Sequence, residues 1–138
     1  MSAITSVEAK GMLVMQTIAM PADTNANGDI FGGWLMAQMD LGASVVARTR
    51  SCGKVATVAV NAMTFHKPVL VGDLVTIYAA LQKTGTTSMH ITVEVWVTRL
   101  PSQNRLKVTE ATFVFVAVDG KGEKRHLPKG IGQNPPDI

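Results

Sequence analysis

The feature that most constrains the fold is one helical segment that is apolar on every side. Residues 32–51, GGWLMAQMDLGASVVARTRS, contain no proline and follow a turn-rich lead, PADTNANGDIF. The large apolar side chains are distributed all round the helical wheel: Trp34, Met39, Leu41, Val45 and Val46. A helix without a wide polar face is a buried helix. We therefore expect the rest of the chain to curl around this helix, which should end near Cys52-Gly53.

The segments around the predicted helix have the sequence character of β-strands. The pattern is clearest at residues 88–98, where Met89 to Val97 place an apolar side chain at every second position. This alternation predicts a strand with one buried face. The other predicted strands cover residues 11–20, 54–64, 74–83 and 106–118. Short connections, such as the hairpin at 84–87, favour antiparallel pairing.

A sole buried helix among about five strands needs a sheet that curls around it. The sequence therefore predicts an α+β domain, in which a curved antiparallel sheet wraps around one long central helix. The side of the helix that the sheet leaves uncovered needs a partner, most simply a second copy across a two-fold axis. We expect the domain to span residues 8–122 and a polar C-terminal tail, rich in Pro and Gly, to span 123–138.

Composition excludes several classes of protein. The net charge of +3 is mild and the basic residues are scattered, so nucleic acid is not an expected partner. No apolar run reaches membrane-spanning length, and the opening residues, MSAITSVEAK, do not have the pattern of a signal peptide. The single cysteine, Cys52, rules out an internal disulfide and fits a reducing compartment. We expect a cytoplasmic protein with no membrane partner.

Asp40 is the one ionisable group between Gly32 and Ala47. A single aspartate in a helix is usually solvated, but the residues around this one are apolar on every side of the helix. Burial of a lone carboxylate is costly, and many enzymes use a desolvated carboxylate for proton transfer or for nucleophilic attack. Asp40 is therefore our candidate general base or nucleophile.

Three stretches of the chain together resemble a known family. They are DTNANGDIFGGWLMAQMDLGAS (23–44), VAVNAMTFHKPVLVGDLV (58–75) and VEVWV (93–97). In this order and spacing they resemble the hotdog-fold acyl-CoA thioesterases, and most of all the YciA-like subgroup of acyl-CoA thioester hydrolases. The resemblance covers nearly the whole chain, from about Val7 to about Pro128.

That resemblance implies a hotdog fold, in which an antiparallel sheet wraps a central helix. It implies protomers paired as dimers with sites at their interface, often assembled as hexamers built from three dimers. The implied reaction is hydrolysis of acyl-CoA to a free carboxylic acid and CoA, without a metal or redox cofactor. Because Met-rich walls accept varied shapes, we expect a broad range of acyl chains.

The chain departs from many members of that family at two places. Phe31 stands just before the Gly-Gly pair at 32–33, where many relatives have histidine, so any role of that imidazole is absent here. Residues 85–88 read Gly-Thr-Thr-Ser where relatives often have Gly-Arg-Ser-Ser, so this hairpin lacks an arginine for the nucleotide. The residues expected to bind substrate are Phe31, Trp34, Ser44, Lys67, Thr86 and Ser88.

Thioester hydrolysis needs a polarised carbonyl and either an activated water or an attacking carboxylate. Gly32 and Gly33 stand at the helix N-terminus, where amides have no internal partner, and glycine lets a substrate approach closely. Asp40 lies seven residues after Gly33 on nearly the same face, about 10 Å farther along the axis. One carbonyl carbon cannot readily reach both groups. We therefore predict a composite site, with Asp40 from one protomer and the glycine amides from its mate.

Several other residues have two interpretations each. Asn25 either bonds its own loop or orients a water near the carbonyl. Ser44 either bonds back to the helix or contacts substrate, and Lys67 either meets a CoA phosphate or is solvated. The Gly-Gly pair could also be no more than a tight helix entry. The three histidines, at positions 66, 90 and 126, lack ligand spacing, so no metal site is expected.

Three classes of function remain open on the sequence. The leading one is an acyl-CoA hydrolase that uses Asp40. The second is a non-catalytic hotdog protein that binds acyl-CoA and acts as a sensor. The third is a hydratase or dehydratase, whose chemistry usually pairs a histidine with a carboxylate. We rank it lowest because the sequence places no histidine near the predicted helix.

Overall fold

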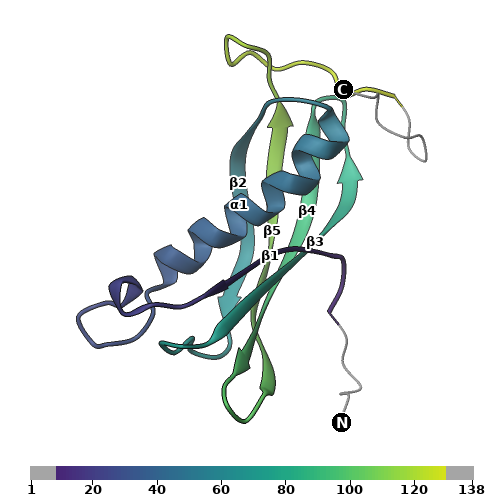
Figure 1. The fold of residues 1–138 in the computed structure, drawn as a ribbon. Helices are drawn as coiled ribbons and strands as arrows, with labels where there is room; N and C mark the ends of the chain where they lie inside the picture. Colours follow the sequence, from purple (N-terminus) through teal and green to yellow (C-terminus); the bar gives the residue numbers. More distant parts are fainter. Residues whose placement is uncertain (1–8, 130–138) are drawn as a thin grey trace.

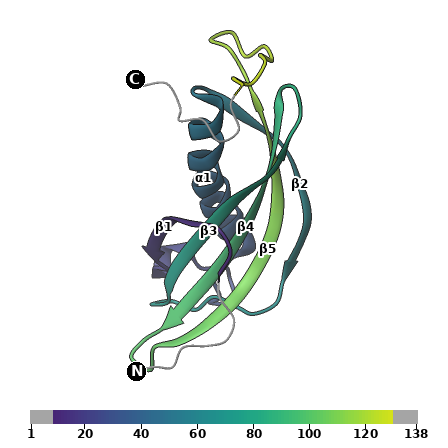
Figure 2. The same ribbon diagram turned by 90° about the vertical axis from the view of Figure 1, so that its right-hand side faces the viewer.

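One helix lies against one face of a curved, five-stranded antiparallel sheet (Figure 1, Figure 2). The computed structural model describes residues 9–129. The elements in chain order are β1 (Met12–Ile18), the short 3-10 helix η1 (Pro21–Asp23), α1 (Gly32–Ser51), β2 (Val55–Phe65), β3 (Leu74–Thr84), β4 (Ser88–Arg99) and β5 (Asn104–Ala117). The sheet order is β1-β3-β4-β5-β2, so β1 and β2 are its edges. The predicted α+β architecture is confirmed.

The helix occupies the predicted residues, and its end has a local cause. Cys52 follows α1 with φ of 56°, in the left-handed region, and its backbone N–H bonds the carbonyl of Arg48. Arg48 and Arg50 lie in the last turn, where cations interact favourably with the helix dipole. Small and apolar residues form the side of α1 that faces the sheet: Leu35, Met39, Gly42, Ala43 and Ala47.

Gly42 brings α1 close to the sheet. A Cβ at this position would lie 3.0 Å from Cγ2 of Val14 on β1 and 3.1 Å from Cγ2 of Ile77 on β3. Those distances leave little room for any side chain at the crossing point. The position of the helix on the sheet therefore depends on this residue having no side chain.

The central strand β4 supplies more buried core residues than any other strand. Its predicted inward residues are all fully buried: Met89, Ile91, Val93, Val95 and Val97. The sequence also predicted that the alternate residues face solvent, and that is wrong for Glu94 and Trp96, which are 2% and 4% exposed. The Nε1 of Trp96 donates to Oε1 of Glu94 at 2.9 Å, and Lys107 on β5 lies 3.7 Å from Oε2. Long side chains therefore cover the outer face of the sheet here.

The side of α1 away from the core is open in the single chain. Met36 and Leu41 are 38% and 58% exposed, and on β2 Val58 and Phe65 are 55% and 47% exposed. The sheet curls around the helix but leaves this side of it uncovered, because β2 ends the sheet at this edge. These four residues, here called the α1/β2 surface, are the apolar side for which a partner was predicted.

Residues beyond β5 lie against the C-terminal end of α1, at the top of Figure 1. The guanidinium of Arg125 donates to three carbonyl oxygens, those of Val118 (2.8 Å), Ser51 (2.9 Å) and Lys54 (3.1 Å). The predicted domain boundary after residue 122 stays a prediction, and residues 130–138 of the predicted tail lie outside the described residues. Within residues 9–129, no helix is long and apolar enough to cross a membrane.

Candidate active site

The N-terminus of α1 presents backbone donors. Phe31 precedes the helix in an extended conformation, and its side chain makes no capping hydrogen bond. Its carbonyl accepts the N–H groups of Trp34 (3.1 Å) and Leu35 (3.4 Å). Among the hydrogen bonds of residues 9–129, none is donated by the amides of Gly32 and Gly33. These two N–H groups, at the positive end of the helix dipole, can therefore donate hydrogen bonds to a ligand oxygen.

Two aromatic rings flank the glycine pair. A Cβ on Gly32 would lie 3.3 Å from Cζ of Phe65, which ends β2, and a Cβ on Gly33 would lie 3.4 Å from the ring of Phe31. Both rings are partly exposed, at 47% and 41%. Side chains at positions 32 and 33 would press against these rings, so glycine keeps the backbone accessible between them.

A cleft of about 330 Å³ opens beside the helix N-terminus. Its lining combines apolar residues with two basic side chains: Ile30, Gly32, Leu35, Phe65, His66, Lys67, Pro68 and Val69. The fold thus brings Lys67, predicted to bind substrate, next to Gly32. The expectation that no histidine lies near the helix is wrong, because His66 lines the same cleft. The chain after β2 turns back toward the start of α1, which local sequence does not reveal.

Asp40 lies on the side of α1 that faces β2. Its Oδ1 accepts a hydrogen bond from Oγ1 of Thr57 at 2.5 Å. The residue is half-buried in the single chain, so one protomer does not supply the dry setting that the sequence suggested. Leu41 beside it and Val58 beside Thr57 both belong to the exposed α1/β2 surface. Asp40 therefore stands at the rim of the surface for which a partner was predicted.

Asn25 is held within its own loop. Its Oδ1 accepts the backbone N–H groups of Asn27 (2.9 Å) and Asp29 (3.2 Å), and its own N–H donates to the carbonyl of Asp29 at 2.7 Å. These bonds are the loop-forming role considered for Asn25. These bonds occupy the side-chain oxygen of Asn25. The orientation of a water by its side-chain amide stays a prediction.

Two further candidates on α1 have structural contacts. Oγ of Ser44 donates to the carbonyl of Leu41 at 2.6 Å, the back-bond considered from the sequence. Trp34 is half-buried and packs against the core. Their predicted contacts with substrate stay predictions.

Thr86 and Ser88 lie at the other end of the molecule. The carbonyl of Thr86 accepts the N–H of Leu127, and the carbonyl of Ser88 accepts the N–H of Gly85. Leu127 belongs to the segment that lies at the C-terminal end of α1, and a 20-residue helix is about 30 Å long. One chain therefore does not bring Thr86 or Ser88 together with the glycine pair at the helix N-terminus.

Sequence reasoning missed Thr57, Phe65 and His66. Thr57 could have been noticed as a hydroxyl in an otherwise apolar stretch of the predicted strand 54–64. From the sequence, Phe65 was only a residue that ends that strand, and His66 was a loop residue, either solvated or near a phosphate, that lacked metal-ligand spacing. Their place in the cleft depends on tertiary contacts. Within residues 9–129, no three His, Cys, Asp or Glu side chains gather as metal ligands.

Comparison with known proteins decides the family. The sequence profile described as the thioesterase superfamily matches residues 27–99, which is more than half of the chain. The chain belongs to this superfamily. The match spans the glycine pair, Asp40, Thr57 and the loop that bears Lys67, and Asn25 lies two residues before it.

Individual thioesterases are similar over most of the chain. The acyl-CoA thioester hydrolase YciA of Salmonella typhimurium is 56% identical over 122 residues, which cover 86% of this chain and 92% of that protein. A hexameric thioesterase from Yersinia pestis superposes with a TM-score of 0.86 at 55% identity, covering 89% of this chain and 100% of that one. A hexameric broad-specificity acyl-coenzyme A thioesterase gives 0.85 at 50% identity, with coverages of 89% and 85%. The predicted family, hotdog fold and enzyme class are confirmed.

Proposed function

We propose that this protein hydrolyses acyl-CoA to a free carboxylic acid and CoA. The observation that carries the proposal is the arrangement on α1, where two free glycine amides begin a helix that also bears Asp40. The chain that carries this arrangement is 56% identical to an acyl-CoA thioester hydrolase. The amides would bind the oxygen that becomes negatively charged as the thioester carbonyl is attacked. No metal or redox cofactor enters this chemistry.

Asp40 can act by either of two routes. As a general base, its carboxylate takes a proton from water while the water oxygen attacks the carbonyl carbon; the C–S bond then breaks and the CoA sulfur takes up the proton. As a nucleophile, its oxygen attacks the carbon, CoA leaves, and water cleaves the resulting anhydride. Single-turnover hydrolysis in ¹⁸O-water identifies the second route if water attacks the aspartyl carbonyl of the anhydride, because the label then enters the aspartate, whereas the first route places it only in the product acid.

A relative supports a joint role for Asn25 and Asp40. Structures of an acyl-CoA hydrolase from Staphylococcus aureus, 28% identical to this chain, include one with an asparagine changed to alanine and one with an aspartate changed to alanine. Those two positions are 15 residues apart, the same separation as Asn25 and Asp40 here. We infer that Asn25 positions the attacking water or the carbonyl through its amide nitrogen.

The site becomes complete when a second copy covers the α1/β2 surface. Such a dimer would bury the exposed Leu41 and Val58 and would desolvate Asp40 beside them. The glycine amides of one protomer and the Asp40 carboxylate of the other would then act on the same thioester. Because similar thioesterases are hexameric, we propose three such dimers per assembly. Thr86 and Ser88 would contact CoA from another protomer. A cytoplasmic location stays a prediction.

One observation favours the hydratase alternative: His66 lines the same cleft, beside the helix N-terminus. A hydratase would change the absorbance of an enoyl-CoA without releasing thiol. A non-catalytic sensor would bind acyl-CoA without either change. The hydrolase is favoured because the relatives at 55–56% identity are named acyl-CoA thioester hydrolases.

Thiol release from a series of acyl-CoA chain lengths tests the proposal. We expect turnover of several chain lengths by the wild-type protein, and a loss of about 10²- to 10⁴-fold in kcat for Asp40→Asn. That variant keeps the size and an acceptor oxygen for Thr57, so it isolates the charge. Undiminished turnover in Asp40→Asn would contradict the catalytic role of the carboxylate. Binding without turnover by the wild type would indicate the sensor.

A further inference from the structure

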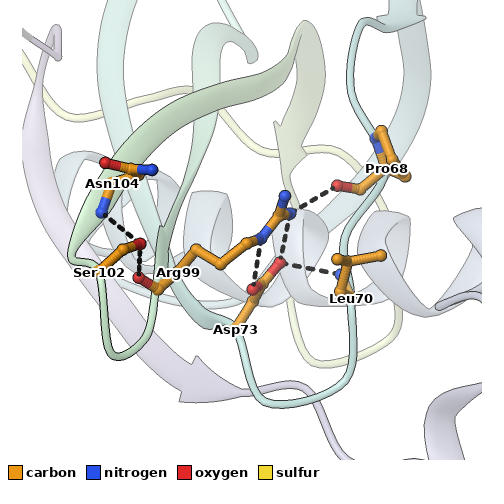
Figure 3. Close-up of polar contacts among 6 residues, drawn as sticks. All are labelled: Pro68, Leu70, Asp73, Arg99, Ser102 and Asn104. Carbon is orange, nitrogen blue, oxygen red and sulfur yellow. Dashed lines mark hydrogen bonds and ion pairs between the residues drawn. The ribbon is translucent and has the colours of Figure 1, made fainter.

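An ion pair between a buried aspartate and a half-buried arginine lies just outside the cleft. Oδ1 of Asp73, at the start of β3, is 3.0 Å from Nε of Arg99 at the end of β4, and Oδ2 is 2.9 Å from Nη2 (Figure 3). Asp73 is only 2% exposed. The hydrogen bond from Arg99 to Asp73 raises the pKa of the guanidinium above its ordinary value. Two parallel bonds of this kind fix direction as well as distance.

Both members of the pair also hold the loop between β2 and β3. Oδ2 of Asp73 accepts the backbone N–H of Leu70 at 2.8 Å, and Nη2 of Arg99 donates to the carbonyl of Pro68 at 3.3 Å (Figure 3). The backbone is therefore held on each side of Val69. Neither Asp73 nor Arg99 lines the cleft, so their effect on it passes through this loop.

The held segment is one wall of the cleft. Residues 65–69 all line it, opposite Gly32 and Leu35 on α1. Val69 is 4% exposed in the core, and its carbonyl accepts the N–H of Ile30 at 3.4 Å. Wall 65–69 thus contacts Ile30, just before α1, on one side and Arg99 of the ion pair on the other. Residues 66 and 67 carry the two basic side chains that line the cleft.

We propose that Asp73 and Arg99 are positioning residues for substrate: they hold wall 65–69 at the distance from the N-terminus of α1 at which the cleft accepts acyl-CoA. This inference rests on the proposed function and names a determinant of substrate binding within it. Loss of the pair leaves the Gly32 and Gly33 amides and Asp40 intact while the wall takes up other positions. The fraction of molecules able to bind falls, and apparent affinity falls with it.

Kinetics of Arg99→Gln with hexanoyl-CoA test the proposal. If wall 65–69 of Arg99→Gln adopts its binding-competent conformation about a tenth of the time, KM rises about tenfold, while kcat changes by less than about twofold. Arg99→Lys keeps the charge and loses the two-pronged geometry, so its KM should fall between those of the wild type and Arg99→Gln. Asp73→Asn, which keeps an oxygen for the N–H of Leu70, provides a second variant if Arg99→Gln folds poorly.

Lys107→Gln is the matched control. Lys107 pairs with Glu94 and Glu110 on the outer face of the same sheet, and it neither lines the cleft nor bonds the loop between β2 and β3. Its loss should lower stability and leave KM unchanged. Folded Arg99→Gln with a wild-type KM, or an equal rise of KM in Lys107→Gln, would overturn the proposal. If the wild-type protein releases no thiol, the proposed hydrolase function is wrong instead. The role of the wall is then tested by calorimetry, in which CoA should bind Arg99→Gln more weakly than the wild type.

Discussion

Thr57 on β2 donates a 2.5 Å hydrogen bond from its Oγ1 to Oδ1 of Asp40 on α1. The bond joins the helix to an edge strand and leaves Oδ2 of the carboxylate available to a substrate or water. A hydrogen bond to a charged group typically contributes about 1.5–3 kcal/mol. Thr57 therefore orients the carboxylate of Asp40, because this side chain cannot turn without losing the bond.

Removing the hydroxyl of Thr57 should slow the chemical step. In Thr57→Val we expect kcat for acyl-CoA hydrolysis to fall about 10- to 100-fold with little change in KM, since the lost bond orients the base rather than the substrate. Thr57→Ser retains a donor and should stay within about threefold of the wild type. Steady-state thiol release measures both. Equal rates in the valine and serine variants would show that the hydroxyl has no catalytic part.

Mixed assemblies should reveal whether two protomers share a site. Asp40→Asn and a chain disrupted at Gly33, for example Gly33→Pro, are each expected to be nearly inactive. Coexpression should restore about one working site per mixed dimer, because the intact Asp40 of one chain meets the intact amides of the other. Differently tagged chains allow the mixed species to be purified before thiol release is measured. Absence of recovery in a verified mixed species would refute the composite site.

A charge on the α1/β2 surface should weaken self-association. Leu41 is 58% exposed in one protomer, and in the proposed dimer Leu41→Glu would bury an unpaired carboxylate. We expect association to weaken about 100-fold or more, seen as a lower mass in sedimentation or light scattering. Gln82→Glu adds the same charge on exposed β3 and should leave the mass unchanged. A wild-type mass for Leu41→Glu would place the interface elsewhere.

Acid should remove the stabilisation that Glu110 provides. The hydrogen bond from Lys107 lowers the pKa of Glu110 below its ordinary value of 4.5. Because the folded-state pKa is the lower one, the contribution is present above about pH 4.5 and is lost as pH falls through the folded-state value. Glu110 is 47% exposed, so solvent screening keeps this contribution below about 1 kcal/mol.

The corresponding variant is Glu110→Gln, compared with the wild type by urea unfolding between about pH 7 and pH 3. The free energy of unfolding should be slightly lower for the variant at neutral pH, and the two curves should converge in acid. A difference that widens with acidity would show that the interaction has the opposite sign.

Local periodicity was enough to predict the helix and the central strand. The helix bounds at residues 32–51 follow from an unbroken helical pattern with a left-handed exit at Cys52. The five apolar positions of β4 follow from alternation, which depends only on which face meets the core. The glycine pair and Asp40 were predictable as candidates because both stand out against their own neighbours along one helix.

Contacts between distant segments were not predictable. The burial of Glu94 depends on Lys107 of the adjacent strand and on the N–H of Lys10, which bonds Oε1 at 3.3 Å. His66 lies beside the helix N-terminus in a loop that bonds Asp73, Arg99 and Val108, all distant from it in the sequence. Asp40 is half-buried in the single chain, and the periodicity of its helix did not indicate this exposure. Each of these outcomes depends on contacts between residues far apart in the sequence, and the periodicity of a single segment does not report such contacts.

The bonds of Arg125 bear on how the protein can be cut or fused. A version ending with β5 would retain every strand, yet it would leave the carbonyls of Ser51 and Lys54 without their guanidinium donor. Unmet carbonyls at that point loosen the junction between α1 and β2, the two elements that carry Asp40 and Thr57. Protein engineers should therefore attach tags or fusion partners beyond residue 129 and treat the polypeptide through Arg125 as one cooperative unit.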